Sequence, residues 1–164
     1  MTSQFPSIGR KQSDPPSFAN FIPYNALHLA NNTNGLISEY LKPLGITLHE
    51  WHVILFLNHY GKLRIGDLAD LTLIGQSTLS RVIDRMQKRK LVERNINPDN
   101  RRVVEVSLTA PGREVMSNIA PIVDTVHTLL AEALTEEEHG TLFTLFDKLN
   151  NKLAEGKRRL AEES

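Results

Sequence analysis

The sequence predicts a mainly α-helical protein with one small β-hairpin. Apolar residues recur at helical spacing in six stretches of the chain. Residues 103–108 instead alternate between apolar and polar side chains, as a half-buried strand does, and residues 91–94 form a second short strand. The turn formers Pro98, Asp99 and Asn100 lie between them and are typical of a hairpin tip. We therefore expect helices to build the fold, with a single hairpin beside them.

Composition limits the class of protein. The chain has 164 residues, 40% of them hydrophobic and 23% charged, which is enough for one domain or two small lobes. It has no Cys, which excludes a disulfide scaffold, a thiolate zinc site and a cysteine nucleophile. No apolar run approaches the roughly 18 residues that span a membrane, and residues 1–16 are polar and Pro-rich without a signal core. We expect a cytoplasmic protein, without a membrane partner, whose residues 1–16 form a flexible arm.

Two helices are expected in the first third of the chain. The first covers residues 18–41, although the poor helix formers at 31–35 either interrupt it or are held by neighbouring segments. Thr47 and Glu50 have the spacing of a capping box. They open a strongly apolar helix that ends near Gly61.

Residues 64–86 are expected to form two helices joined by a tight turn. The first is short and covers residues 64–71, and the turn covers 72–75. The second begins at Gln76, and one face is apolar at the spacing i, i+3, i+4 and i+7: Leu79, Val82, Ile83 and Met86. Its opposite face is polar: Gln76, Ser77, Ser80, Arg81, Asp84 and Arg85.

Two more helices follow the hairpin. Thr109 caps the first, which tolerates Pro111 in its first turn and should bend at Pro121. Thr135 and Glu138 form a second capping box, which opens the last helix.

Charge is distributed unevenly along the chain. The protein has 19 basic and 19 acidic residues, so its formal net charge is zero. Residues 81–102 nevertheless contain eight basic and three acidic side chains, a net charge of +5, which leaves −5 on the rest. A basic patch on a neutral body is typical of a protein that binds a polyanion. The alternative is a solvated helix face next to a charged loop.

The order helix, tight turn, helix, hairpin over residues 63–109 is that of a winged helix-turn-helix. The second helix of such a unit has the dimensions of the DNA major groove. We therefore expect a DNA-binding domain over residues 46–109, with a recognition helix at 75–90 and a wing at 95–102.

Residues 64–113 resemble the winged-helix core of the multiple-antibiotic-resistance regulator (MarR) family. Five motifs carry the resemblance: Leu68-Ala69, Ser77-Thr78-Leu79-Ser80-Arg81, Leu91-Val92-Glu93-Arg94, Asp99-Asn100-Arg101-Arg102 and Leu108-Thr109-Ala110-Pro111-Gly112-Arg113. The chain departs from the family pattern at Lys90, where Gly usually ends the recognition helix. A left-handed Lys there costs on the order of 1 kcal/mol, so either the helix ends differently or the extra charge offsets the strain at a phosphate. Gly75 stands where Ser or Asp is the commoner N-cap.

The polar residues of this region suggest how DNA is contacted. At the wing tip, Arg101 is placed to enter a minor groove, and Asp99 to orient its guanidinium, and the resemblance implies the same roles. Arg102 is expected on a phosphate or in an internal ion pair, and the alternative is a turn held by a local Asp–Arg pair. In the recognition helix, base edges are expected to meet the N-terminal residues Gln76, Ser77, Ser80 and Arg81. Phosphates are expected to meet the later residues Arg85, Lys88 and Arg89.

A homodimer is expected because the terminal helices carry more apolar surface than a small winged helix can cover. The unpartnered residues are Phe18, Phe21, Ile22, Leu142, Phe143, Leu145, Phe146 and Leu149. Two-fold pairing of the helical region at 17–45 and 110–157 buries them and sets the two recognition helices about 34 Å apart. The expected DNA site is a palindrome.

Catalysis is not expected, because the chain has no HExxH motif and no Gly-rich phosphate loop. No cofactor and no metal are expected either, although His49 and His52 leave a metal-sensing regulator as an alternative. MarR-family regulators often bind an aromatic or phenolic effector. In this chain the residues expected to line such a site are His28, Asn32, Trp51 and His52. A hydrated helix face with a Trp in the core is the alternative.

The sequence therefore predicts a homodimeric transcriptional regulator, a repressor rather than an activator, that a small molecule releases from DNA. The rival hypothesis is a winged-helix interaction protein that no longer binds DNA.

Overall fold

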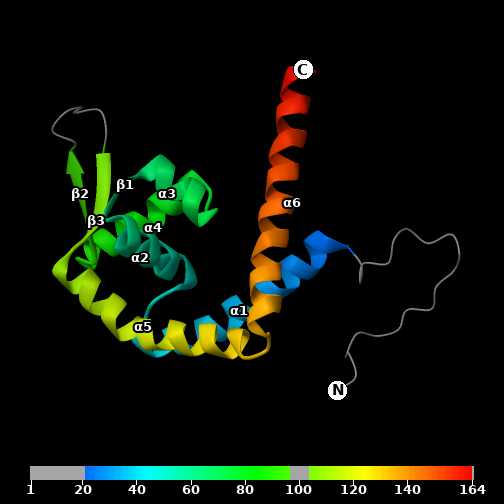
Figure 1. Cartoon of the computed structure of the whole chain (residues 1–164). Helices are drawn as coiled ribbons and strands as arrows, with labels where there is room; N and C mark the ends of the chain where they lie inside the picture. The colour runs from blue at the N-terminus through cyan, green and yellow to red at the C-terminus, as the bar shows by residue number, and fades with distance from the viewer. Residues whose placement is uncertain (1–20, 97–103, 164) are drawn as a thin grey trace, which may run out of the picture. The chain divides into compact units, whose positions relative to one another are not determined.

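The computed structural model describes residues 21–96 and 104–163 (Figure 1). The expected arm at residues 1–16 lies outside them. The elements, in chain order, are α1 (Ile22–Leu41), the short 3-10 helix η2 (Lys42–Leu44), α2 (Leu48–Tyr60), β1 (Lys62–Arg64), α3 (Ile65–Thr72), α4 (Gln76–Lys88), β2 (Val92–Ile96), β3 (Val104–Leu108), α5 (Ala110–Ala131) and α6 (Glu136–Glu162). The expected mainly α fold with a small β-hairpin is confirmed.

Helix α1 runs without a break through residues 31–35, so of the two alternatives for this stretch an interruption is wrong and a continuous helix is correct. Thr33 donates a hydrogen bond from its hydroxyl to the carbonyl of Leu29, 2.9 Å away. The helix buries only Ile37 and Leu41. The rest of its apolar side chains stay on the surface of the chain.

Both expected capping boxes are present. In α2, the backbone N–H of Glu50 donates to the hydroxyl of Thr47 at 3.3 Å, and the N–H of Thr47 donates to the Glu50 carboxylate at 2.8 Å. In α6, Thr135 and Glu138 make the same two bonds at 3.3 and 2.8 Å. Each box satisfies backbone donors that the first turn of a helix leaves unpaired.

The sheet has three strands in the order β1-β3-β2, all antiparallel, so the hairpin has a third strand that the sequence did not predict. In the centre of β3, Val106 lies opposite Leu63 of β1 and Arg94 of β2. Val106 and Leu108 are buried, as the alternation predicted, whereas Val104, expected on the same face, is exposed at the start of the strand. Ser107, expected on the other face, is buried as well, because strands flank it on both sides and it hydrogen-bonds to Glu93.

The hydrophobic core of the segment from α2 to β3 lies among α2, α3, α4 and the sheet, which are close together in Figure 1. All four residues predicted for the apolar face of α4 are buried. Further buried side chains come from α2, α3 and the sheet: Trp51, Val53, Ile54, Leu57, Leu68, Val92, Val106 and Leu108.

The start of α5 packs closely on Leu91, in the short connection between α4 and β2. A β-carbon added to Gly112 would lie 2.0 Å from the carbonyl oxygen of Leu91, so only glycine fits there. Thr109, just before the helix, accepts a hydrogen bond from the N–H of Gly112 at 3.2 Å and donates one to the carbonyl of Lys90. These contacts fix the end of α4 to the start of α5.

The chain divides into two compact units, residues 1–122 and 123–164, and the division falls within α5, beside Pro121. In the second unit, α6 buries none of its side chains among the described residues. Within the described ranges no helix has the length and apolar character needed to cross a membrane.

Candidate nucleic-acid interface

Helix α4 presents a polar face at its N-terminal end. Gln76, Ser77 and Arg81 are exposed and Ser80 is half-buried, because the apolar residues between them face the core. Gly75 occupies the N-cap position and offers no side chain to the first turn. Four of the residues expected to contact DNA therefore lie together at one end of one helix.

The other end of α4 is closed by a left-handed residue, Lys90, with φ of +58°. The N–H of Leu91 donates to the carbonyl of Met86 at 2.9 Å, and the N–H of Lys90 donates to the carbonyl of Gln87 at 2.9 Å. This is the Schellman pattern, which usually has glycine in the position of Lys90. The alternative that the helix ends differently in this chain is wrong.

The turn between α3 and α4 contains a second left-handed residue. Leu73 has φ of +56° and its side chain is 91% exposed. Sequence analysis placed a tight connection here without identifying the strained position. The turn of the helix-turn-helix and the end of its second helix thus each contain a non-glycine residue in a conformation that glycine adopts at lower cost.

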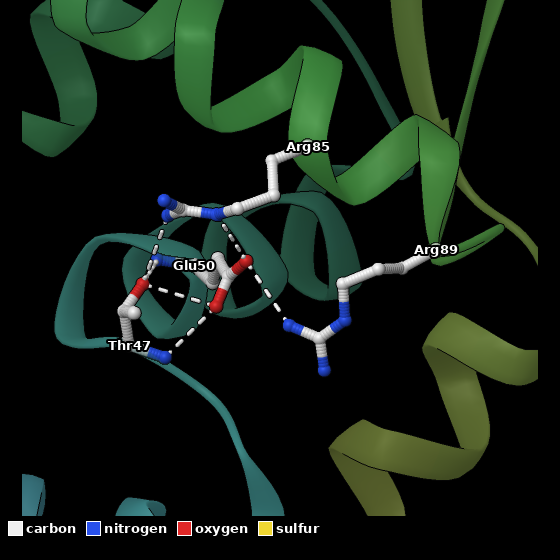
Figure 2. A network of polar contacts seen from close by, with 4 residues as sticks. All are labelled: Thr47, Glu50, Arg85 and Arg89. Atoms are coloured by element: carbon white, nitrogen blue, oxygen red, sulfur yellow. Dashed lines mark hydrogen bonds and ion pairs between the residues drawn. The ribbon is translucent and has the colours of Figure 1, made fainter.

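The carboxylate of Glu50 is fully buried and joins the start of α2 to the end of α4 (Figure 2). Its Oε1 accepts hydrogen bonds from Nε of Arg85 at 3.0 Å and from Nη1 of Arg89 at 3.1 Å. Its Oε2 accepts from the backbone N–H and the hydroxyl of Thr47, at 2.8 and 3.0 Å. Arg85 also donates from Nη2 to the Thr47 hydroxyl at 3.4 Å.

These partners keep Glu50 ionised although it is buried. Burial by itself raises the pKa of the carboxyl, but the N–H of Thr47 and the guanidinium of Arg85 outweigh it and hold the pKa of Glu50 below its ordinary value. Only the carboxylate is buried, because the side chains of Arg85 and Arg89 are 52% and 38% exposed. Solvent therefore screens these pairs, and losing one arginine costs less than the roughly 3–5 kcal/mol of a fully buried pair. The two arginines are thus held to this carboxylate.

Arg85 and Arg89 were expected on phosphates, but both donate to Glu50 in this structure. Lys88, expected in the same role, is exposed. Sequence analysis assigned Glu50 to the capping box alone and missed its second role. Two features of the sequence could have indicated this role. Glu50 stands at the start of a mostly apolar helix, and Arg85 and Arg89 are four residues apart, so they lie on one face of α4.

The base of the wing is joined to the recognition helix by a second ion pair. Nη2 of Arg94 in β2 lies 2.7 Å from Oδ1 of Asp84 in α4, and Nη1 of Arg94 donates to Gln87 at 3.2 Å. The wing tip residues Asp99, Arg101 and Arg102 lie outside the described residues. Their expected roles at the DNA therefore stay predictions.

The residues expected to line an effector site differ in exposure. His28 and Asn32 are exposed on α1, and His28 stacks on Tyr24 at a ring distance of 6.2 Å. Trp51 is only 2% exposed, so its indole belongs to the core. His52 is half-buried, and burial, with His49 nearby, lowers the pKa of its imidazole. No group of three metal-binding side chains occurs within residues 21–96 and 104–163.

A helix-turn-helix followed by a β-hairpin, with a polar and basic second helix, defines the winged helix-turn-helix class of DNA-binding regulators. Comparison with known proteins shows which family of that class the chain belongs to. Residues 44–103 match the model of the MarR family. The chain is 30% identical over 135 residues to the multiple antibiotic resistance protein MarR of Escherichia coli, covering 80% of this chain and 94% of that protein.

Two further comparisons agree. The uncharacterized regulator YsmB of Bacillus subtilis is 31% identical over 121 residues, covering 74% of this chain and 80% of that protein. The crystal structure of the C80S mutant of E. coli MarR complexed with operator DNA superposes with a TM-score of 0.69 at 30% identity, covering 82% of this chain and 99% of that one. This chain belongs to the MarR family of transcriptional regulators, which are not enzymes.

Proposed function

We propose that this protein is a homodimeric repressor that binds a palindromic operator and leaves it when a small aromatic molecule binds. Helix α4 enters the major groove, and the wing at residues 95–102 contacts the adjacent minor groove. A dimer seated on a promoter excludes the transcription machinery, which favours repression over activation. The related E. coli MarR has been crystallised with operator DNA, which supports this mode of binding.

The observation that carries the proposal is the exposed polar face of α4. Gln76, Ser77, Ser80 and Arg81 have the donors and acceptors that discriminate base edges. Arg81 and Lys88 form no ion pair with any residue in the described ranges, so their charges are available to DNA. At the wing, Arg101 enters the minor groove, Asp99 orients it, and Arg102 contacts a phosphate.

Exposed apolar side chains on the terminal helices support the homodimer. On α6 they recur at helical spacing: Phe143, Phe146, Leu149 and Leu153. On α1 they lie at the N-cap and in the first two turns: Phe21, Ile22, Tyr24 and Leu27. Exposed apolar side chains grouped along one helix are typical of an interface. A second copy of the chain covers it and pairs two recognition helices for a two-fold DNA site.

Sedimentation equilibrium at micromolar concentration tests the dimer. The parent should sediment as a dimer, and Phe143→Asp should shift it toward the monomer. Asn151→Asp adds the same charge on the side of α6 opposite Phe146, Leu149 and Leu153 by helical spacing, and should leave the dimer intact. A monomeric parent would contradict the proposal.

Binding to DNA is tested by selecting duplexes from a random-sequence pool with the parent protein and measuring fluorescence anisotropy across salt concentrations. Selected duplexes should share a palindrome, and affinity should fall steeply with salt, since several phosphates are contacted by each subunit. A pool that yields no enriched sequence would favour the rival function, a winged-helix interaction protein.

The effector is tested by adding aromatic carboxylates and phenols to the complex, with acetate as the control. Release from the selected duplex by an aromatic compound alone is the expected result, and His28→Ala and Asn32→Ala should weaken it. Trp51 is a poorer choice for this test, because its replacement opens the core. Release by zinc, reversed by a chelator, would instead support the metal-sensing alternative at His49 and His52.

A further inference from the structure

The basic side chains near the end of α4 fall into two groups. Arg85 and Arg89 both donate to one buried oxygen, Oε1 of Glu50. All four side chains reach solvent, but Arg81 and Lys88 have no such partner among the described residues. The number of positive charges on the recognition helix is therefore larger than the number that have no ion pair within the protein.

Glu50 depends on these arginines. Its side chain has no exposed surface, and within residues 21–96 and 104–163 its one other partner is Thr47, which supplies an N–H and a hydroxyl. If both arginines turned to phosphates, a buried carboxylate would lose both of its cationic partners. Such a loss costs more than a screened contact at the protein surface returns, so the arginines stay on Glu50.

The geometry of Arg85 supports the same conclusion. Its Nε donates to Glu50 and its Nη2 donates to Thr47, so one whole edge of the guanidinium is directed toward the start of α2 (Figure 2). That edge is one of the two with which a guanidinium can bind a phosphate through two parallel bonds. The remaining edge, formed by Nη1 and Nη2, keeps its donors, but the bonds to Glu50 and Thr47 fix where it points.

We propose that Glu50 is a specificity residue, which withholds Arg85 and Arg89 from the DNA backbone and so limits binding to sequences other than the operator. This inference rests on the proposed function, since it concerns how the same helix divides its contacts. Phosphate contacts carry no sequence information and strengthen binding to every duplex. With two arginines withheld, a larger share of the affinity comes from base contacts at the other end of α4.

The experiment compares salt slopes of binding to a random-sequence duplex for the parent, Glu50→Gln and Glu39→Gln. Both variants remove one negative charge. Glu39 lies on α1, where it pairs with the exposed Lys42, and among the described residues it binds no arginine of α4. In Glu50→Gln the freed arginines reach phosphates. The plot of log K against log salt should then steepen by about 0.9 for each new contact, beyond the Glu39→Gln control. The ratio of operator to random-duplex affinity should fall.

A Glu50→Gln slope equal to that of Glu39→Gln, or shallower than it, would overturn the inference. Circular dichroism shows whether Glu50→Gln folds. If Glu50→Gln does not fold, Arg89→Gln is tested instead. In that variant Glu50 is still paired with Arg85, so the fold should be retained. Arg89→Gln should change the slope less than Lys88→Gln does, because Lys88 is the residue expected on a phosphate and has no ion pair among the described residues. An equal loss would overturn the inference. A parent protein that binds no duplex contradicts the proposed function itself, and this inference with it.

Discussion

The guanidinium of Arg94 lies 2.7 Å from the carboxylate of Asp84, so the first strand of the wing is tied to the outer face of the recognition helix. The two residues are ten positions apart in the chain and belong to β2 and α4. Because both side chains are partly exposed, water and salt screen this pair.

Asp84→Asn should therefore lower the free energy of unfolding by less than about 1 kcal/mol at low salt, and by less still at high salt. Urea unfolding at the two salt concentrations measures the difference. Glu155→Gln, which breaks the exposed pair with Lys152 on α6, is the control. If Asp84→Asn lowers the free energy of unfolding by the same amount at high salt, Asp84 stabilises the protein through an interaction other than this ion pair.

Lys90→Gly should stabilise the protein by about 1 kcal/mol, because glycine adopts the left-handed conformation of this position without a steric penalty. Lys88→Gly removes the same side chain two residues earlier, in right-handed helix, and should destabilise instead. Denaturant unfolding at one fixed protein concentration compares both with the parent. Equal effects of the two substitutions would contradict the assigned backbone conformation.

Gly112→Ala should destabilise the protein by about 3 kcal/mol, because its β-carbon would lie 2.0 Å from the backbone of Leu91 and the start of α5 must move. Gly35→Ala is the matched control. No atom lies within 4 Å of its β-carbon, and Gly35 is inside α1, so alanine there should stabilise by about 0.5–1 kcal/mol. Thermal unfolding of the two variants should shift in opposite directions, and a Gly112→Ala protein as stable as the parent would exclude the close contact.

Stability should depend on pH through Glu50. Its pKa is lowered in the folded protein, so the unfolded chain takes up the proton first as the solution is acidified. The stabilisation is complete above about pH 4.3, the ordinary value for glutamate, and is lost as pH falls through the lower folded value. The difference in unfolding free energy between the parent and Glu50→Gln should shrink below that pH. A difference that stays constant from neutral to acid pH would show that Glu50 is not held ionised.

Arg81→Ala and Arg101→Ala should impair DNA binding in different ways. Loss of Arg81 should cost about 1–3 kcal/mol on the selected duplex and relax discrimination at one base position. Loss of Arg101 should cut affinity strongly while leaving the fold and the dimer intact. Fluorescence anisotropy with Lys152→Ala as the charge control makes the comparison, and two variants that bind like the parent would refute both assignments.

Much of the candidate site could be predicted from local patterns. The spacing of Leu79, Val82, Ile83 and Met86 determines which face of α4 is buried, and hence which face carries Gln76, Ser77 and Arg81. Thr47 and Thr135 marked two helix starts, because a cap and its partner are only three residues apart. Such features depend on neighbours along the chain, which the sequence shows directly.

The partners of Arg85 and Arg89 could not be predicted in this way. Glu50 lies 35 and 39 positions away from them, and nothing in the local pattern of either helix indicates that their ends meet. Strand β1 was missed for the same reason, since three residues become a strand only by pairing with β3. The sequence by itself determined the helices, their caps, the hairpin and the basic character of the recognition helix. Only the tertiary structure decided which of those positive charges a buried carboxylate neutralises, because that depends on packing between segments far apart in the chain.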